Sequence, residues 1–317
     1  MVLEAREVRQ EALRVVFGEA LSDLADYFPN ILLLDGDLGN STRADIFAER
    51  RPDKFLQMGI AEQNMMGAAA GLATLGFIPF ISTFAAFAVK RAADQVRVVI
   101  AQPNLNVKIT GGYSGLLTGK TGKTHQSVED IAVMRAMPHM TVVAPADGPE
   151  LRGVLRAACE HDGPIYIRLT RDPSPVIFDE SYNFTLGKGV VLREGSDVAI
   201  ISTGVQTTRA VEAAAILEQE GISVYLLHVP TIKPLDEQAT IKAAKRTGRV
   251  VTAEDHSIVG GLGGAVAETL GEYYPTLIKR VGWQDTFGES GPDEALLEKY
   301  GLTPHHVAQA ARDLLRR

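Results

Sequence analysis

A single glutamate stands at the start of a segment built almost entirely from small residues. Glu62 belongs to the run MGIAEQNMMGAAAGLA (residues 58–73), whose Ala, Gly and Met residues predict a helix that another helix or chain approaches closely. Burial at such an interface removes water from a carboxylate and would suit Glu62 to proton exchange near neutral pH. The alternative is structural, because an acid in the first turn also stabilises a helix through its dipole.

Two phenylalanines follow the next apolar run. Phe84 and Phe87 come after FIPFIST (residues 77–83) and are three positions apart. Such a pair most often belongs to a hydrophobic core. At the end of a strand it can also form a flat, dry wall for the ring of a ligand. The sequence therefore offers an acid and an aromatic pair that could serve one site.

Other motifs do not match a phosphate or metal site. Gly119–Thr124 (GKTGKT) resembles a P-loop, but that motif needs a glycine five residues before its Gly-Lys pair, where Ser114 and Leu117 stand. The turn GGLGG (residues 260–264) precedes a helix and could bind an anion, although tight packing explains it more simply. The seven histidines and Cys159 show no metal-binding spacing, so we expect no metal ligands.

Composition narrows the class of protein. The 317 residues are 45% hydrophobic, which indicates a globular fold, and 39 acidic against 32 basic residues give a net charge of −7. No basic excess is available to bind nucleic acid. The single cysteine suggests a reducing compartment. No apolar run reaches the roughly 18–20 residues that span a bilayer, and no secretion signal is visible. We expect a cytoplasmic protein that binds neither nucleic acid nor membrane.

Short apolar runs alternate with amphipathic helical segments along the chain. This alternation predicts an α/β fold with two open α/β domains and mostly parallel sheets. The predicted strands of the first half are residues 31–35, 77–83, 105–110, 141–146 and 164–169. Ligands bind at the carboxyl ends of such strands, where this chain has polar residues. Residues 171–189 lack a helical period and predict a linker. We place the domains at residues 1–180 and 187–317.

Five segments, in this order, resemble the C-terminal half of transketolases: DGDLGNST, GIAEQNM, STFAAF with RAADQVR, THQSVEDIAVMRAMP and GGLGGAVAE. The resemblance covers roughly residues 10–315. It implies a pyrimidine-binding domain of the thiamine diphosphate fold followed by a smaller transketolase C-terminal domain. The family's diphosphate-binding domain, with its GDG…N metal motif, has no counterpart in this sequence. The chain is therefore similar to the C-terminal subunit of a split transketolase, which would hold half of each active site.

The resemblance implies thiamine diphosphate as cofactor, with Mg²⁺ or Ca²⁺ held by the partner subunit. Glu62 matches the glutamate that shares a proton with N1′ of the aminopyrimidine ring, which makes it the predicted catalytic residue. Phe84 and Phe87 match the aromatic residues beside that ring, and Gln63 belongs to the same cofactor-binding motif. Asp37 matches a strand-end aspartate that lines the thiazolium side.

The resemblance also supplies substrate-binding residues. Arg14 and Ser41 match an arginine and a serine that bind the substrate phosphate, and Arg171 matches the arginine of a nearby turn. Arginine's planar fork pairs with phosphate or sulfonate oxygens, although each arginine could instead form a surface salt bridge. His125 matches a catalytic position that contacts substrate hydroxyls near the reacting carbon. Tyr113 stands where many relatives place a histidine that faces the substrate phosphate.

The same loop departs from the family. Transketolases usually carry a GEDGP-type run, whereas this chain has GKTGK at Gly119–Lys123, with lysine and threonine in place of both acids. The family's aspartate in this run contacts the donor hydroxyl next to the carbonyl. Its loss predicts a shorter, differently charged or modified sugar in place of the usual donor.

The implied reaction is transfer of a two-carbon ketol unit from a ketose or ketose phosphate to an aldose. It requires an N-terminal, diphosphate-binding transketolase subunit as partner. The apolar face of the Glu62 helix predicts a homodimer, and hence an α2β2 assembly. Two alternatives remain: a subunit of another thiamine diphosphate enzyme, deoxyxylulose-phosphate synthase-like or 2-oxoacid dehydrogenase β-like, and a non-catalytic partner subunit. The second domain carries no predicted site residue.

Overall fold

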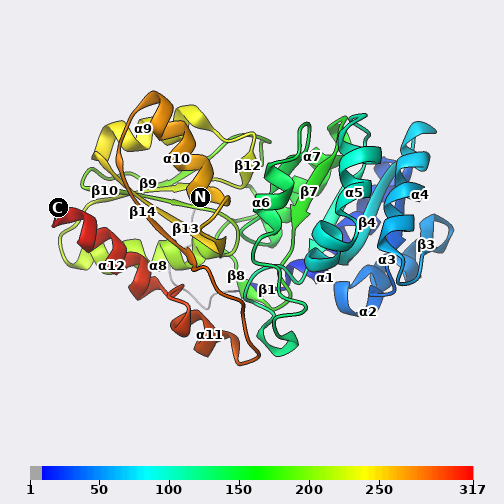
Figure 1. Cartoon of the computed structure of the whole chain (residues 1–317), viewed down its shortest axis with the longest axis horizontal. Helices are drawn as coiled ribbons and strands as arrows, with labels where there is room; N and C mark the ends of the chain where they lie inside the picture. Colours follow the sequence, from blue (N-terminus) through cyan, green and yellow to red (C-terminus); the bar gives the residue numbers. More distant parts are fainter. Residues whose placement is uncertain (1–8, 317) are drawn as a thin grey trace.

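The computed structural model describes residues 9–316. The first eight residues of predicted domain 1–180 and the last residue of predicted domain 187–317 lie outside the described residues. Figure 1 shows two α/β units side by side, one from each half of the chain. None of the helices in residues 9–316 is long and apolar enough to cross a membrane.

The first unit is built on a mixed sheet with the strand order β12-β6-β7-β5-β4-β2-β3. All neighbours are parallel except β12, which runs antiparallel to β6. The strands are β2 (Ile31–Asp35), β3 (Phe55–Gln57), β4 (Ile78–Phe84), β5 (Lys108–Gly112), β6 (Thr141–Val143), β7 (Ile165–Arg168) and β12 (Thr231–Lys233). Their apolar sequences follow from burial on both faces, as in other parallel sheets.

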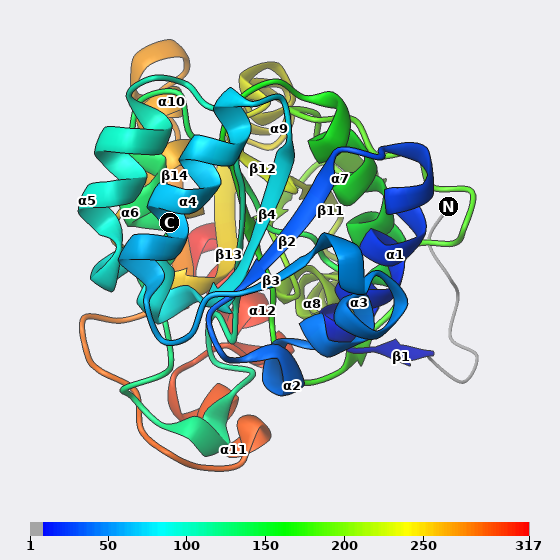
Figure 2. The same cartoon turned by 90° about the vertical axis from the view of Figure 1, so that its right-hand side faces the viewer.

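Helices cover both faces of this sheet. One face carries α1 (Leu13–Tyr27), α3 (Ala44–Arg50) and α7 (Gly148–Glu160), and the other carries α4 (Glu62–Thr74) and α6 (Asp130–Arg135) (Figure 2). Successive strand residues point to opposite faces, so Leu33 and Leu34 enter different hydrophobic clusters. The parallel strands β2 to β7 are thereby fixed in position, with their carboxyl ends on the same side of the sheet.

The second unit has the strand order β14-β13-β10-β11-β9, with only β9 antiparallel among these described strands. The strands are β9 (Val190–Arg193), β10 (Val198–Ser202), β11 (Val224–His228), β13 (Arg249–Ser257) and β14 (Leu277–Trp283). The helices α8 (Gln206–Gln219) and α12 (Pro304–Leu315) pack together, and so do α9 (Glu237–Thr247) and α10 (Leu262–Tyr273). Both units thus have the α/β architecture expected from the sequence.

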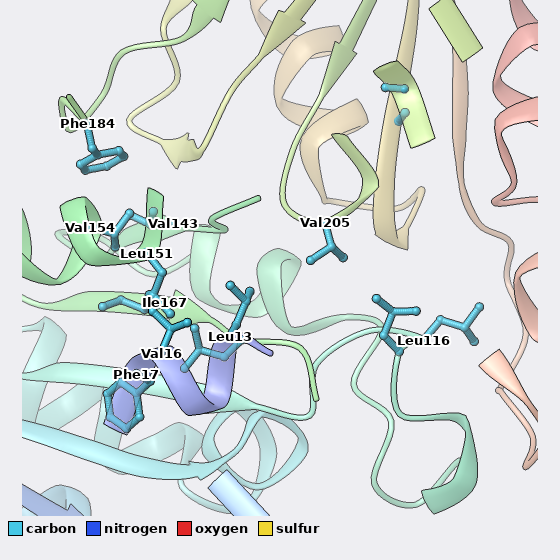
Figure 3. Packing of buried hydrophobic residues seen from close by; sticks show 14 of the residues in the cluster. Leu13, Val16, Phe17, Leu116, Val143, Leu151, Val154, Ile167, Phe184 and Val205 are labelled. Carbon is cyan, nitrogen blue, oxygen red and sulfur yellow. The ribbon is translucent and has the colours of Figure 1, made fainter. Parts of the chain in front are cut away.

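The two units share contacts that a sequence pattern does not reveal. Strand β12 comes from the second half of the chain but completes the first sheet. Within the first unit, a short ribbon pairs β1 (Gln10–Glu11) with β8 (Ser174–Pro175). One hydrophobic cluster contains Leu13, Leu116 and Val205, and Figure 3 shows it passing from the first unit to the second. The segment predicted as a linker is also packed, because Phe178 and Phe184 are buried.

The helical segment after β4 is irregular. It consists of the π-helices η2 (Phe87–Arg91) and η3 (Val96–Ala101), with α5 (Ala93–Gln95) between them. A π-turn contains one more residue than an α-turn and is often found at functional sites. Here it determines where the side chains of residues 87–91 lie relative to the start of α4.

Candidate active site

Three neighbouring parallel strands end at the same edge of the first sheet. Asp35 ends β2 and is the register partner of Ser82 in β4, while Phe84 ends β4 beside Gly112 of β5. The polar and aromatic residues that follow these strands are therefore brought together, as expected for a ligand site in an open α/β sheet.

An aromatic cluster forms at this edge. The Phe84 ring stacks on Tyr113 with the centroids 4.0 Å apart and lies 5.7 Å from Phe87. His125 contacts Phe84 and Phe87 edge-on, with centroids at 5.9 and 5.5 Å. Tyr113 has a φ of 57°, a left-handed conformation that is costly for a bulky residue and often occurs at functional sites. Four residues predicted from the sequence thus meet in one wall.

Glu62 lies beside this wall at the first turn of α4. Its side chain is 1% exposed, and both carboxylate oxygens accept hydrogen bonds from Nη1 of Arg91 at 2.8 Å. The Arg91 guanidinium lies over the Phe87 ring, 4.3 Å from its centroid. Gln63 donates from Nε2 to the Arg91 carbonyl oxygen at 3.1 Å. Arg91 therefore connects the predicted acid to the aromatic wall.

Arg91 was not selected from the sequence, although it begins the RAADQVR segment. It ends the π-helix η2 and contacts Glu62 on another helix, a pairing that the spacing rules for residues on one helix do not reveal. An arginine shortly after the aromatic pair was the only available signal.

Cationic side chains surround Tyr113. Nη1 of Arg14 donates to the Ser41 carbonyl oxygen at 2.8 Å and to the Tyr113 hydroxyl at 3.5 Å. The Arg171 guanidinium carbon lies 5.6 Å from the Tyr113 ring centroid. The same guanidinium group forms an ion pair with Asp172. The Ser41 hydroxyl donates to Asn40 at 3.3 Å, so the backbone of Ser41 makes the contact with Arg14. These groups can bind an anion.

Asp35 and Asp37 occupy different environments at the end of β2. Asp35 is fully buried, and its Oδ2 accepts from the backbone N–H of Leu38 and of Gly39 and from Gln57 Nε2, at 3.0 to 3.1 Å. Burial raises the pKa of Asp35 above its ordinary value. Asp37 is exposed, with a φ of 63°, and only its backbone N–H bonds to Gln57. Sequence reasoning selected Asp37, whose role stays a prediction, and did not consider Asp35.

The lysine-containing part of the loop after β5 lies at the surface. Lys120 and Lys123 are exposed, and Gly119–Thr121 forms the 3-10 turn η4. His125 is half-buried, and its Nδ1 lies 2.8 Å from the Thr124 hydroxyl. The loop thus combines exposed positive charge with a half-buried imidazole next to the aromatic wall.

The described residues suit only part of a large cofactor. Within residues 9–316, no group of three or more His, Cys, Asp or Glu side chains is arranged to hold a metal ion. In contrast, the buried Glu62 carboxylate beside the Phe84 and Phe87 rings fits a flat heterocycle that exchanges a proton.

Two family models match the chain. The model for the transketolase pyrimidine-binding domain covers residues 9–175, and the model for the transketolase C-terminal domain covers residues 187–307. This chain belongs to the transketolase family.

Relatives of this transketolase chain include separate subunits. It is 43% identical over 311 residues to a 6-deoxy-6-sulfo-D-fructose transketolase subunit of Clostridium sp. (strain MSTE9), covering 98% of this chain and 97% of that protein. It is 35% identical to one subunit of an apulose-4-phosphate transketolase of Phocaeicola vulgatus, covering 96% of this chain and 98% of that protein. A 1-deoxy-D-xylulose-5-phosphate synthase of Symbiobacterium thermophilum is 37% identical but is matched over only 47% of its length.

Solved structures agree with this assignment. A split-gene transketolase described as an inactive β4 tetramer superposes with a TM-score of 0.90 at 47% identity, covering 96% of this transketolase chain and 98% of the other. The transketolase of Campylobacter jejuni superposes with a TM-score of 0.81 at 23% identity over 48% of its own length, which shows the shared fold.

Proposed function

We propose that this transketolase chain provides the pyrimidine-binding half of a split enzyme's active site. The reaction is transfer of a two-carbon ketol unit from a ketose donor to an aldose acceptor. One observation carries the proposal: buried Glu62 and the Phe84, Phe87, Tyr113 and His125 rings gather at one sheet edge. No metal-binding cluster is found among the described residues, and in this proposal a partner subunit supplies those ligands.

The residues at this edge fit the aminopyrimidine end of thiamine diphosphate. When bound, this cofactor supplies the nucleophilic carbon that allows a C–C bond next to a ketose carbonyl to break. Glu62 would exchange a proton with the ring nitrogen N1′, and Phe84 and Phe87 would cover the ring and exclude water. Gln63 holds the backbone of Arg91, which in turn contacts Glu62. Asp37, at the exposed edge, faces the thiazolium side in this proposal.

The substrate lies, in this proposal, between the aromatic wall and the arginines. Arg14 and Arg171, with the Tyr113 hydroxyl, would bind the terminal anionic group of the donor. The guanidinium fork suits phosphate or sulfonate oxygens alike. His125 would hydrogen-bond donor hydroxyls near the reacting carbon. Ser41 positions Arg14 through its carbonyl oxygen.

A modified or differently charged ketose is the proposed donor. Lys120 and Thr121 stand where ordinary transketolases carry two acids, and the exposed Lys120 and Lys123 make the loop positive. The relatives named for sulfofructose and for apulose 4-phosphate support a donor other than the usual pentose phosphate.

The proposed assembly contains two copies of this chain and two of a diphosphate-binding subunit. The outer face of α4 is open, because nothing lies within 4 Å of a Cβ placed at Gly67 or at Gly71. Such a face allows close approach by a second copy. The split-gene relative, an inactive β4 tetramer, supports self-association of this type of chain and the need for a partner.

Calorimetric titration of thiamine diphosphate and Mg²⁺ tests the half-site proposal. The chain alone is expected to bind weakly, and a mixture with its diphosphate-binding subunit tightly. Tight binding by the chain alone would contradict the proposal, because the diphosphate would then be held by residues of this chain.

A donor panel tests the reaction. We expect the assembled enzyme to turn over a ketose with a terminal sulfonate or phosphate and to transfer two carbons to an aldose. Efficient turnover of xylulose 5-phosphate would remove the reason for proposing a modified sugar, and turnover of a 2-oxoacid instead of a ketose would favour the alternative enzyme classes. Activity that survives Glu62→Ala would favour a non-catalytic subunit.

A further inference from the structure

The loop between β5 and α6 has little regular structure of its own. We define the substrate loop as residues 113–127, which carry Tyr113 at one end and His125 near the other. It contains the short turn η4 and is closed at its base by a hydrogen bond from Gly115 N–H to the Ser127 carbonyl oxygen at 2.7 Å. A loop of this length needs outside contacts to hold one conformation.

One of these contacts comes from the second sheet. Asp255, in β13, is 2% exposed, and its two carboxylate oxygens accept from the Leu116 N–H at 3.0 and 3.1 Å. A Cβ placed at Gly115 would lie 2.0 Å from Asp255 Oδ2, and Gly115 has a φ of 70°. Only glycine lets the loop backbone approach the carboxylate this closely.

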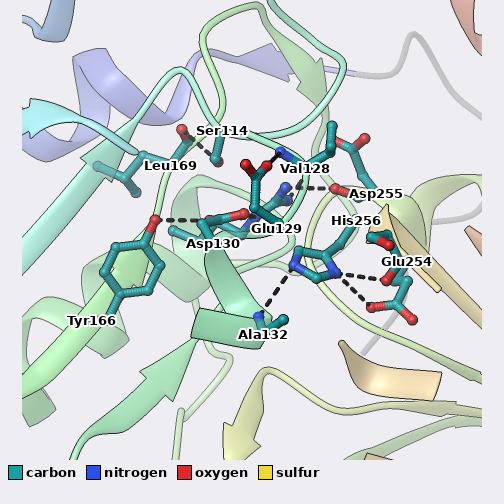
Figure 4. Close-up of polar contacts among 12 residues, drawn as sticks. Ser114, Val128, Glu129, Asp130, Ala132, Tyr166, Leu169, Glu254, Asp255 and His256 are labelled. Carbon is teal, nitrogen blue, oxygen red and sulfur yellow. Dashed lines mark hydrogen bonds and ion pairs between the residues drawn. The ribbon is translucent and has the colours of Figure 1, made fainter. Parts of the chain in front are cut away.

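Asp255 is itself held by a buried polar network (Figure 4). Arg168 bonds through Nε to Asp130 at 2.9 Å, and its Nη1 lies 3.9 Å from Asp255 Oδ2. Tyr166 donates to Asp130 at 2.7 Å, and Ala132 N–H donates to His256 Nε2 at 3.3 Å. The contacts of the Asp255 carboxylate thus come from the first unit, through the Leu116 N–H and the Arg168 guanidinium, which Asp130 holds in turn.

A second set of contacts fixes the tip of the substrate loop. Gly119 N–H donates to Asp293 Oδ1 at 2.8 Å, and Gly291 N–H donates to the Gly119 carbonyl oxygen at 3.1 Å. Gln126 Nε2 donates to the Glu289 carbonyl oxygen at 3.1 Å. These partners also belong to the second half of the chain. Ser114, next to Tyr113, is held within the first unit by the Leu169 carbonyl oxygen. Among the attachments from the second half of the chain, Asp255 is the closest in sequence to Tyr113.

We propose that Asp255 is a positioning residue for the transfer reaction. It belongs to the second domain but acts on the active site of the first. By holding Leu116, Asp255 fixes the substrate loop so that Tyr113 faces Phe84 and the two arginines. This inference rests on the proposed function, since it assigns the loop a role in binding the donor. It gives the second domain a part in catalysis beyond packing.

Asp147 provides a matched control. It is 1% exposed and accepts three backbone N–H bonds, from Glu150, Ile177 and Phe178, at 3.0, 2.7 and 2.8 Å. Its contacts lie away from the substrate loop. Loss of either carboxylate leaves buried N–H groups unpaired and destabilises the protein. Only loss of Asp255 should disturb the donor site.

The first test is kinetic and uses the full chain assembled with its diphosphate-binding subunit. Asp255→Ala is expected to raise the donor KM at least about tenfold and to leave cofactor affinity within about twofold of wild type, because a displaced loop mispositions the donor only. Asp255→Asn keeps one acceptor oxygen and should restore most of the loss. Asp147→Ala should lower Tm without changing KM. Wild-type kinetics for Asp255→Ala, or an equal KM change in Asp147→Ala, would overturn the proposal.

The second test does not depend on activity. Hydrogen exchange of the amides at residues 114–126 should be at least about tenfold faster in Asp255→Ala than in wild type, and unchanged in Asp147→Ala. Unchanged exchange in Asp255→Ala would overturn the positioning role. If the loop is released but the wild-type assembly transfers no ketol unit, the proposed function fails and the attachment of the loop stands.

Discussion

Buried charges are treated differently at the site edge and at the contact between the two domains. At the domain contact, Arg168 bonds to Asp130, and Glu150 bonds to His228, Tyr182 and the Ala146 N–H. At the site edge, by contrast, Arg14 Nε and Asp35 Oδ1 have no partner. These are the only charged side chains in residues 9–316 with a buried atom left unpaired.

We interpret these two unpaired atoms as groups that await a ligand, whereas Glu62 at the same site already pairs with Arg91. Nearly all buried polar atoms in native proteins are hydrogen-bonded, because an unpaired buried charge is costly. The cost is tolerated where a substrate, cofactor or partner subunit completes the bonding. Four substitutions test whether buried charges at the site and elsewhere have different roles, and each has an outcome that would contradict this difference.

The largest effect is expected at Glu62. Glu62→Gln keeps the shape of the side chain but removes proton exchange, so kcat should fall about 10²–10⁴-fold. Tm should fall only modestly, because the Arg91 partner of Glu62 is nearly half exposed and can be solvated. Turnover by the assembled enzyme and a thermal melt measure the two quantities. Glu237→Gln, which changes an exposed first-turn acid of α9, is the control. An equal loss of kcat in the control would contradict a catalytic role for Glu62.

Glu150 represents the domain contact. Glu150→Ala leaves the His228 imidazole, the Tyr182 hydroxyl and a backbone N–H without their acceptor, all in a fully or largely buried setting. We expect unfolding free energy to fall by about 3 kcal/mol or more, with donor KM unchanged in the folded fraction. Urea unfolding gives the first value and kinetics at low temperature give the second. A change in donor KM without loss of stability would contradict a purely structural role for Glu150.

Arg14 represents the site edge. Arg14→Ala should raise the KM of an anionic donor about 10–100-fold, because a charged hydrogen bond to the substrate is lost. The KM of a ketose without a terminal anion should stay the same in this variant. If both donors respond equally, or if neither does, Arg14 is a structural residue and not an anion ligand.

Lys108 adds a buried charge away from the site to the comparison, and its expected effect is a smaller, pH-dependent change in folding stability. Its side chain is fully buried in β5 and donates to the carbonyl oxygens of His161 and Gly163 at 2.8 and 2.7 Å. Burial lowers the pKa of Lys108 to about 7. Between pH 7 and the ordinary lysine pKa the unfolded chain binds more protons, so rising pH stabilises the fold.

Lys108→Met should remove this dependence. The stability of wild type relative to the variant should increase by about 2 kcal/mol between pH 7 and pH 9, as measured by urea unfolding at both values. A difference that is constant with pH, or that shrinks as pH rises, would show that Lys108 stays charged in the folded protein.

Much of the regular secondary structure could be predicted from the sequence. The apolar runs 31–35 and 77–83 correspond closely to β2 and β4, because strands buried on both faces leave a continuous apolar signal. Residues 87–101, after β4, are instead interrupted by π-turns, which no periodic pattern in the sequence indicates. Strand β12 has only three residues and no periodicity, so its place in the first sheet depends on tertiary contacts alone.

The candidate site could be predicted from the sequence only in part. The family motifs led to Glu62, Phe84, Phe87, Tyr113 and His125, and these residues lie close together. Arg91 and Asp255 were missed because their contacts join segments that no local pattern connects. Asp35 was not considered beside Asp37, two positions away, because the sequence does not show which of the two carboxylates is buried. The catalytic and binding roles of these residues remain predictions.

The position of strand β12 affects whether the two domains can be separated or exchanged. Residues 9–175 match one family model and residues 187–307 another, which suggests two exchangeable modules. Excision of the first module would remove Thr231–Lys233 and expose the backbone groups of β6 that now pair with it. An uncovered strand edge recruits other chains, so the isolated module should aggregate. Chimaeras of such enzymes should therefore exchange both domains as a single cassette.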